Sequence, residues 1–223
     1  MDASPSPRRS LLRGAAWTVP VILASTASPA LAVSRQPVRM LWSGFPRATL
    51  SRRLAEPASQ TVDGVVVTAT LERPRQLVHP GDNWTAADGR LTLQSNDVTT
   101  GSSEQIVTLT FNAPVTKVSL TVEEIDRGSS PDFADEVYVP AGAPRTTEHS
   151  AGAKVTGAGT PENPFRATPD VAGKATGPDH AVTLRWAGPV KQIRIGYRQG
   201  VRSNAGANPT IRISPVTFTP TGG

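Results

Sequence analysis

The sequence predicts an all-β protein: a single antiparallel β-sandwich of the jelly-roll or immunoglobulin-like type, preceded by a cleavable signal peptide. Two observations lead to this class. From Val33 to Gly223 apolar residues recur with a period of two, and outside the first 32 residues no segment of ten or more has a helical stripe. The 19 Gly and 21 Pro residues lie largely between the strand-like runs, which indicates many turns rather than disorder.

A repeated motif is the third observation. Residues 107–120 read VTLTFNAPVTKVSL and residues 182–195 read VTLRWAGPVKQIRI. Because proline fixes φ and donates no ladder hydrogen bond, Pro114 and Pro189 predict a turn, and each copy is expected to be a β-hairpin or a strand, corner, strand unit. Duplication and convergence of two amphipathic hairpins explain the repeat equally well. Either way, two such units suit the inward faces of a sandwich.

Shorter runs predict the remaining strands and loops. The segment LVHPGDNWTAADGR is expected to be a loop because of its Pro, Gly, Asn and Asp content. The region Pro140 to Asp179 is rich in Gly, Pro, Ala and Thr, and is expected to contain one short strand and to pack in part against the domain. The expected strands outside the repeat are 64–73, 91–94, 153–156 and 210–219, the last with a bend at Ser214-Pro215.

The N-terminus has the three parts of a secretory signal peptide: the charged PRRSLLR, the apolar GAAWTVPVILAS, and an Ala-x-Ala ending at Ala30 and Ala32. The Arg8-Arg9 pair followed by Leu-Leu-Arg resembles a twin-arginine export signal, and an ordinary secretion signal is the alternative. A membrane-spanning helix is disfavoured, because spanning needs about 20 apolar residues and Pro20 interrupts this run.

Cleavage is therefore expected after residue 32, and the protein is expected to be secreted or extracellular. The membrane would be contacted only through the signal peptide before cleavage. The expected organisation is a signal peptide at 1–32, an N-terminal arm and first strand at 33–59, and the β-sandwich at 60–219.

Cysteine and charge restrict the classes of function. The chain has no cysteine, which excludes a disulfide framework, a thiolate metal site and a cysteine nucleophile. The formal charge of +5 falls to +3 once residues 1–32 are removed, because 20 basic and 17 acidic residues remain. The basic residues are scattered and not interleaved with aromatic residues, so no nucleic-acid partner is expected.

An acidic stretch follows the first copy of the repeat. Hard oxygen ligands on a turn-forming loop suit calcium, so Asp126, Asp132 and Asp135 are candidate calcium ligands and calcium is the expected cofactor, if any. The spacing is not that of an EF-hand. The alternatives are aspartates that cap turns and stay solvated, partner recognition, or catalysis. The six carboxylates of the stretch are Glu123, Glu124, Asp126, Asp132, Asp135 and Glu136.

A second candidate site is the trio Asp82, Asn83 and Trp84. An aromatic ring beside hydrogen-bonding side chains on a loop can stack on a sugar, whereas the alternative is a tryptophan that folds over the edge of the sandwich. No catalytic or phosphate-binding fingerprint is present. The histidines have no two-histidine metal spacing and are expected to be exposed: His79, His149 and His180.

The string VTLTFNAPVTKVSLTVEEID, followed after a gap by DEVYV, resembles a β-sandwich module of secreted and surface proteins of Gram-positive bacteria. The signal peptide is similar to those of actinobacterial secreted proteins. In the module, a Pro-Val corner and a strand ending Asp-Ile-Asp precede an Asp-x-Val strand. Asp126 and Asp135 match this pattern, and Glu124 replaces its first Asp. The resemblance covers residues 60–219 and implies extracellular binding more than catalysis.

These observations predict a secreted extracellular or cell-surface-associated protein without enzymatic activity. Its expected partner is a cell-wall or environmental glycan, or a surface protein. The alternative is a secreted carbohydrate-active hydrolase that uses carboxylates of the 123–136 loop.

Overall fold

The computed structural model describes residues 35–45, 57–72, 84–95, 104–128, 133–140, 145–149, 152–169, 177–200 and 209–221. The predicted signal peptide lies outside these ranges, including Arg8, Arg9, Ala30 and Ala32. All described residues belong to one compact unit, Arg35–Gly223. None of the helices in the described ranges has the length and apolar character needed to cross a membrane.

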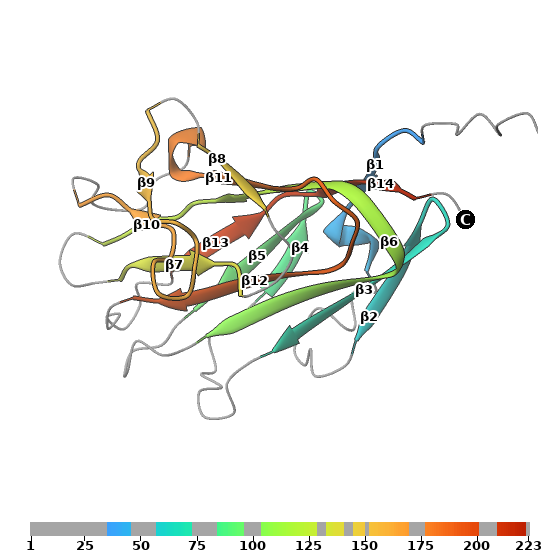
Figure 1. Ribbon diagram of the computed structural model, residues 1–223. Helices are drawn as coiled ribbons and strands as arrows, with labels where there is room; N and C mark the ends of the chain where they lie inside the picture. Colours follow the sequence, from blue (N-terminus) through green and yellow to red (C-terminus); the bar gives the residue numbers. More distant parts are fainter. Residues whose placement is uncertain are drawn as a thin grey trace, which may run out of the picture. The chain divides into compact units, whose positions relative to one another are not determined.

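The described residues form an antiparallel β-structure, which confirms the predicted all-β class (Figure 1). Twelve strands are hydrogen-bonded into one continuous sheet, and two further strands form a small separate one. In chain order the elements are β1 (Val38–Met40), η1 (Trp42–Gly44), β2 (Ala58–Val62), β3 (Val65–Glu72), β4 (Trp84–Ala87), β5 (Arg90–Gln94), β6 (Gln105–Glu123), β7 (Asp135–Tyr138), β8 (Thr146–His149), β9 (Val155–Thr156), β10 (Arg166–Ala167), η2 (Pro178–His180), β11 (Val182–Trp186), β12 (Val190–Gln199), β13 (Thr210–Ile213) and β14 (Val216–Pro220).

Strand β6 is the centre of the large sheet and is the long green strand in Figure 1. Its first half pairs with β3 on one side and β12 on the other. Its second half pairs with β11 on one side and with β13 and β14 on the other. A single 19-residue strand therefore joins the two halves of the sheet, and five other strands are positioned by it.

The two copies of the repeated motif pair with each other. Val107 lies opposite Ile195, and Val182 lies opposite Val122, so each copy begins beside the end of the other. The predicted turn at Pro114 is wrong, because β6 continues through it. In the pairing of β12 with β6, Val190 lies opposite Val115 and Gln192 lies opposite Thr110, with a shift of register between them. Pro114 lies in this interruption of the ladder, where no backbone N–H is required.

The second copy has the predicted strand, corner, strand form. Residues 187–189 separate β11 from β12, and both strands pair with β6. The left-handed residue of β6 is Lys117, with a φ of 51°, and its nitrogen lies 3.5 Å from the carbonyl oxygen of Ala187. This residue of β6 therefore lies beside the corner between β11 and β12.

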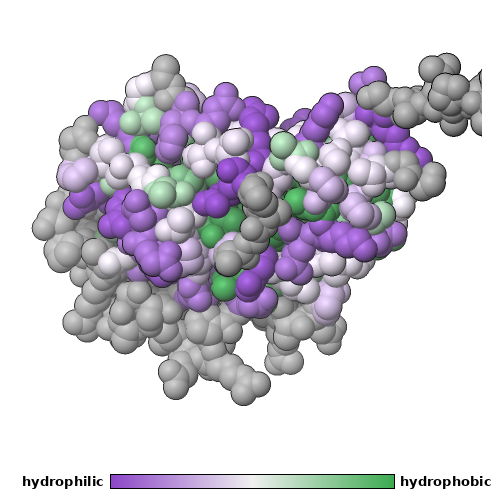
Figure 2. All heavy atoms as spheres, viewed as in Figure 1, coloured by the Kyte–Doolittle hydropathy of each residue, from purple (hydrophilic) through white to green (hydrophobic). Residues whose placement is uncertain are grey.

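One apolar core lies inside the sheet. Phe111 of β6 and Phe218 of β14 pack edge to face, with ring centroids 5.3 Å apart. Trp186 is buried on β11, and Trp42 of η1 is also buried while its Nε1 donates a hydrogen bond of 2.8 Å to the carbonyl oxygen of Ser214. Burial of each such side chain contributes about 1.5–3 kcal/mol. The face seen in Figure 2 has many hydrophilic residues around a central band of hydrophobic ones, and Leu41 is the large apolar side chain exposed among the described residues.

Two Asp-Gly hairpins connect neighbouring strands. Asp63 and Gly64 join β2 to β3, and Asp88 and Gly89 join β4 to β5. All four residues have positive φ, between 48° and 77°, as a two-residue type I′ turn requires. The loop predicted over LVHPGDNWTAADGR is therefore wrong from Trp84 onward, because these residues form a strand and its turn. The predicted strands at 64–73 and 91–94 are confirmed as β3 and β5.

The region between Pro140 and Asp179 packs against the sheet in its described parts. Strand β8 pairs with β11. Strand β9 pairs with β10 and lies within the strand expected at 153–156. Phe165, which is fully buried, forms an isolated bridge with Val137 of β7. The bend predicted at Ser214-Pro215 is confirmed, since it separates β13 from β14.

Candidate functional site

The fold separates the acidic stretch into three environments. Glu123 and Glu124 line one pocket, and Glu136 lines another. Asp126 and Asp135 are buried in the interior. Asp132 lies outside the described residues. The carboxylates that are neighbours in the sequence therefore do not form a single site in the described part of the chain.

Asp135, the first residue of β7, is completely buried and bound by protein donors. Its Oδ1 accepts hydrogen bonds from the Tyr197 hydroxyl at 2.8 Å and the Gln199 amide at 3.0 Å. Its Oδ2 accepts the backbone N–H of Asp126 at 3.1 Å. Burial raises the pKa of Asp135 to about 7, although the hydrogen bonds from Gln199 and Tyr197 oppose that shift. The carboxyl group thus changes its charge near neutral pH inside the fold.

A buried contact between a histidine and an aspartate adjoins this group. His180 of η2 is 5% exposed, and its Nδ1 lies 3.1 Å from Oδ1 of Asp126. The backbone carbonyl of His180 accepts the N–H of Ile125 at 3.0 Å, and the carbonyl of Asp126 accepts the N–H of Asp135 at 2.9 Å. These contacts link η2, the end of β6 and the start of β7.

The expectation of an exposed His180 is wrong. His180 is the last residue of η2, directly before β11, and it is buried there together with Ala181. His149 is exposed on β8 as expected, with its ring 6.0 Å from that of Phe165. His79 lies outside the described residues.

The structure brings together two of the three predicted calcium ligands. Asp126 and Asp135 are joined through the backbone N–H of the former, but each also has protein partners. Among the described residues, no group of three or more His, Cys, Asp and Glu side chains could hold a metal ion. Asp132 is not described, so calcium remains a prediction.

The predicted glycan-binding trio is described only in part. Asp82 and Asn83 lie outside the described residues. The backbone of Trp84 is in strand β4, paired with Leu93 of β5, and not in the predicted loop.

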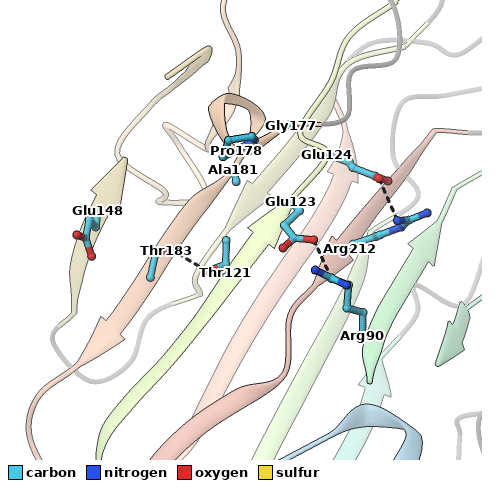
Figure 3. Close-up of a pocket in the computed structure, with 10 residues that line it drawn as sticks. All are labelled: Arg90, Thr121, Glu123, Glu124, Glu148, Gly177, Pro178, Ala181, Thr183 and Arg212. Carbon is cyan, nitrogen blue, oxygen red and sulfur yellow. Dashed lines mark hydrogen bonds and ion pairs between the residues drawn. The ribbon is translucent and has the colours of Figure 1, made fainter. Parts of the chain in front are cut away.

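The larger pocket has a volume of about 460 Å³ and opens on the outer face of the sheet (Figure 3). Thr121 of β6 and Thr183 of β11 lie in it, with their hydroxyls 2.8 Å apart. They point outward because they alternate with inward residues such as Leu120 and Leu184. Figure 3 shows the threonine pair between Glu148 on one side and the Arg90–Glu123 pair on the other. The lining is Arg90, Thr121, Glu123, Glu124, Glu148, Gly177, Pro178, Ala181, Thr183 and Arg212.

Ion pairs hold the charged side chains of this pocket. Arg90 Nε lies 3.0 Å from Glu123 Oε2, and Arg212 Nη1 lies 3.3 Å from Glu124 Oε1. Two arginines and three glutamates give the lining a formal charge of −1. Exposed ion pairs contribute only about 0–1 kcal/mol each, so their main effect is to orient the polar groups.

The conformation of Glu124 explains why two consecutive glutamates line one pocket. Neighbouring residues of a strand point to opposite faces. Glu124 follows the last residue of β6 and has a φ of 60°, in the left-handed region. This turn at the strand end brings its carboxylate to the same pocket as that of Glu123. A sequence pattern of period two could not show it.

A second, smaller pocket of about 160 Å³ lies beside Glu136. Its lining is Arg127, Ala134, Glu136, Arg166, Ala167 and Gly200. Glu136 Oε2 accepts a hydrogen bond from Arg198 Nε at 2.8 Å, and Glu136 Oε1 lies 3.9 Å from Arg166 Nη1. Residues far apart in the sequence therefore assemble a basic site that scanning the chain for charge runs does not reveal.

The described residues thus define an all-β protein with polar pockets at its sheet. No family model matches the chain, and no curated protein matches it. Among solved structures it is similar to the adhesin domain of PrgB from Enterococcus faecalis bound to DNA. The TM-score is 0.41 and the identity 10%, over 75% of this chain and 68% of that chain.

The prediction that nucleic acid is not a partner is contradicted by this comparison and is not kept, because the matched domain is bound to DNA. The prediction had a physical weakness as well. It assumed that basic residues scattered in the sequence stay scattered in space, whereas Arg127, Arg166 and Arg198 come together around Glu136.

Proposed function

We propose that this chain is a secreted, non-enzymatic binding protein of the extracellular space or cell surface, and that its larger pocket binds a glycan. The observation that carries the proposal is the pocket of about 460 Å³ on the outer face of the sheet. Its size is in the usual range for small-ligand sites, which is about 300–1,000 Å³. The proposed location rests on the signal-peptide features of residues 1–32.

The chemistry of the pocket suits a ligand rich in hydroxyl groups. Sugar hydroxyls donate to carboxylates such as Glu123 and Glu148, and accept from guanidinium groups such as Arg90. The hydroxyls of Thr121 and Thr183 can do both. Most of these side chains are on strands and are held by ion pairs or hydrogen bonds, so little ordering would accompany binding.

A binding role is also supported by the partners of the carboxylates. Glu123 and Glu124 are each paired with an arginine of the pocket, and Glu148 is paired with Arg185 at 2.7 Å. The described lining contains no histidine, serine or cysteine. The serine–histidine and cysteine–histidine pairs that many hydrolases use are therefore not part of this lining.

The test measures binding of a panel of neutral, acidic and amino oligosaccharides to the full chain by isothermal titration calorimetry. Thr183→Val removes one hydroxyl from the pocket with little change of shape, and we expect it to weaken binding about tenfold through the loss of a hydrogen bond. Thr110→Val is the matched control, since Thr110 is an exposed threonine at the other end of β6.

Two results would contradict the proposal. One is that no oligosaccharide of the panel binds. The other is that Thr110→Val weakens binding as much as Thr183→Val, because the hydroxyl in the pocket would then have no special role.

A secreted carbohydrate hydrolase is the second candidate, because three carboxylates line one pocket. Glycosidases commonly use a pair of carboxyl groups across the scissile bond. Release of reducing sugar from the same panel tests this candidate. Release that Glu123→Gln or Glu124→Gln abolishes would favour the hydrolase, whereas binding without release favours the non-enzymatic protein.

A further inference from the structure

The smaller pocket has the opposite charge balance to the larger one. Three arginines from separate segments surround one carboxylate: Arg127 after β6, Arg166 of β10 and Arg198 of β12, all near Glu136 of β7. The charged side chains that line the pocket, Arg127, Arg166 and Glu136, have a formal charge of +1, compared with −1 for the lining of the larger pocket. An excess of guanidinium groups around a cavity favours an anionic ligand.

The arginines have different roles, which their contacts reveal. Arg198 is held by three contacts: its Nε donates to Glu136 at 2.8 Å, its Nη2 donates to the carbonyl of Pro161 at 2.7 Å, and its guanidinium lies 5.1 Å from the centre of the Tyr138 ring. It therefore fixes Glu136 in place. Arg166 lies 3.9 Å from the same carboxylate, beyond hydrogen-bond distance, and its side chain is 46% exposed. Donors of Arg166 therefore remain for a ligand.

Backbone hydrogen bonds keep the base of this pocket rigid. Arg127 forms an antiparallel bridge with Ala134, and the N–H of Gly200 donates to the carbonyl of Ala134 at 2.8 Å. A Cβ at Gly200 would lie 2.5 Å from Glu136 Oε1, so glycine leaves the space that the carboxylate occupies. The backbone around the pocket and the position of the Glu136 carboxylate are thus set before any ligand arrives.

We infer that the pocket lined by Arg127, Arg166 and Glu136 binds an oxyanion of the phosphate class. The planar fork of a guanidinium group matches two oxygens of a phosphate, which gives short, charge-assisted hydrogen bonds. A volume of about 160 Å³ corresponds to about five water molecules, so a single phosphate group fits together with some of its hydration. The phosphate can come as the free anion or as a phosphodiester of a nucleic-acid strand.

The experiment titrates inorganic phosphate into the full chain, with chloride buffers of equal ionic strength as the reference, and follows heat of binding. Wild type is expected to bind phosphate saturably. Arg166→Gln and Arg127→Gln each remove a guanidinium group from the pocket and are expected to weaken binding about tenfold or more. Arg185→Gln is the matched control, because Arg185 is exposed to a similar extent, 53%, and pairs with Glu148 outside this pocket.

Arg185→Gln should leave the affinity for phosphate unchanged within about twofold, as expected for a remote, screened charge. A melting temperature in chloride close to that of wild type shows that each variant is folded. The inference is overturned if phosphate shows no saturable binding, or if Arg185→Gln weakens binding as much as Arg166→Gln does.

A short single-stranded oligonucleotide separates the two sources of phosphate. The pocket takes a phosphodiester if the oligonucleotide binds, if inorganic phosphate displaces it, and if Arg166→Gln weakens its binding. If phosphate binds and the oligonucleotide does not compete with it, the pocket takes the free anion. Both results support an oxyanion site.

Discussion

The buried carboxyl group of Asp135 is expected to make the stability of the fold fall as the pH rises toward neutral. Its pKa is raised from an ordinary value of 3.8 to about 7, chiefly by desolvation, with a further contribution from the charge of Asp126. Between these pH values the folded state binds the proton and the unfolded state does not. The free energy of unfolding therefore decreases with rising pH across this window.

The magnitude follows from the size of the pKa difference. Each unit corresponds to about 1.4 kcal/mol, so Asp135 alone should lower the free energy of unfolding by about 4 kcal/mol between pH 4 and pH 8. The effect should be almost complete at pH 8 and absent below pH 4. A total domain stability of about 5–15 kcal/mol makes this loss easy to detect.

Asp135→Asn isolates the effect, because asparagine has nearly the same shape and does not titrate. The carbonyl oxygen of the asparagine can accept the hydrogen bonds from Tyr197 and Gln199. Its NH₂ group would then face the backbone N–H of Asp126, and two donors cannot form a hydrogen bond with each other. That mismatch costs about 1–3 kcal/mol at every pH and is therefore an offset rather than a slope.

Urea denaturation at several pH values between 4 and 8 measures the slope. The buried tryptophans Trp42 and Trp186 give a fluorescence signal for unfolding. Wild type should lose about 4 kcal/mol relative to Asp135→Asn across this range, since other titrating groups contribute equally to both proteins. Parallel pH profiles for the two proteins would refute the reasoning.

Two further predictions concern a turn and the calcium site. Gly64→Ala should lower the free energy of unfolding by about 1 kcal/mol in the same urea assay, because Gly64 has a φ of +77°. Gly188→Ala is the control: an added Cβ meets no atom within 4 Å at either glycine, but Gly188 does not have a φ in the left-handed region. Its substitution should be neutral or stabilising. If the predicted calcium site exists, calcium should raise the melting temperature, and chelator or Asp132→Asn should remove that rise. An unchanged melting temperature would rule against calcium.

The all-β class could be predicted because alternation is a local property of the chain. Strand β3 alternates buried and more exposed residues along almost its whole length, as the run GVVVTATLER indicates. The two Asp-Gly turns are equally local, and the sequence contains both signals. The pairing of the two motif copies with each other is not local, because either copy could have paired with any other exposed strand edge.

The pockets could not be predicted, because they depend on contacts between residues distant in the sequence. The threonine pair of the larger pocket joins Thr121 to Thr183, and the arginines of the smaller pocket come from three separate segments. The left-handed conformation of Glu124 also has no sequence signal, since glutamate rarely adopts it. The described residues of the acidic stretch divide between two pockets and the interior.

The most direct test of the proposed function is a titration of the tightest-binding oligosaccharide into protein labelled at its threonine methyl groups, followed by NMR. The proposal predicts saturable shift changes at Thr121 and Thr183, with Thr110 unchanged, because only the first two line the larger pocket. Saturable changes at Thr110 with Thr121 and Thr183 unaffected would place the ligand elsewhere and contradict the proposal.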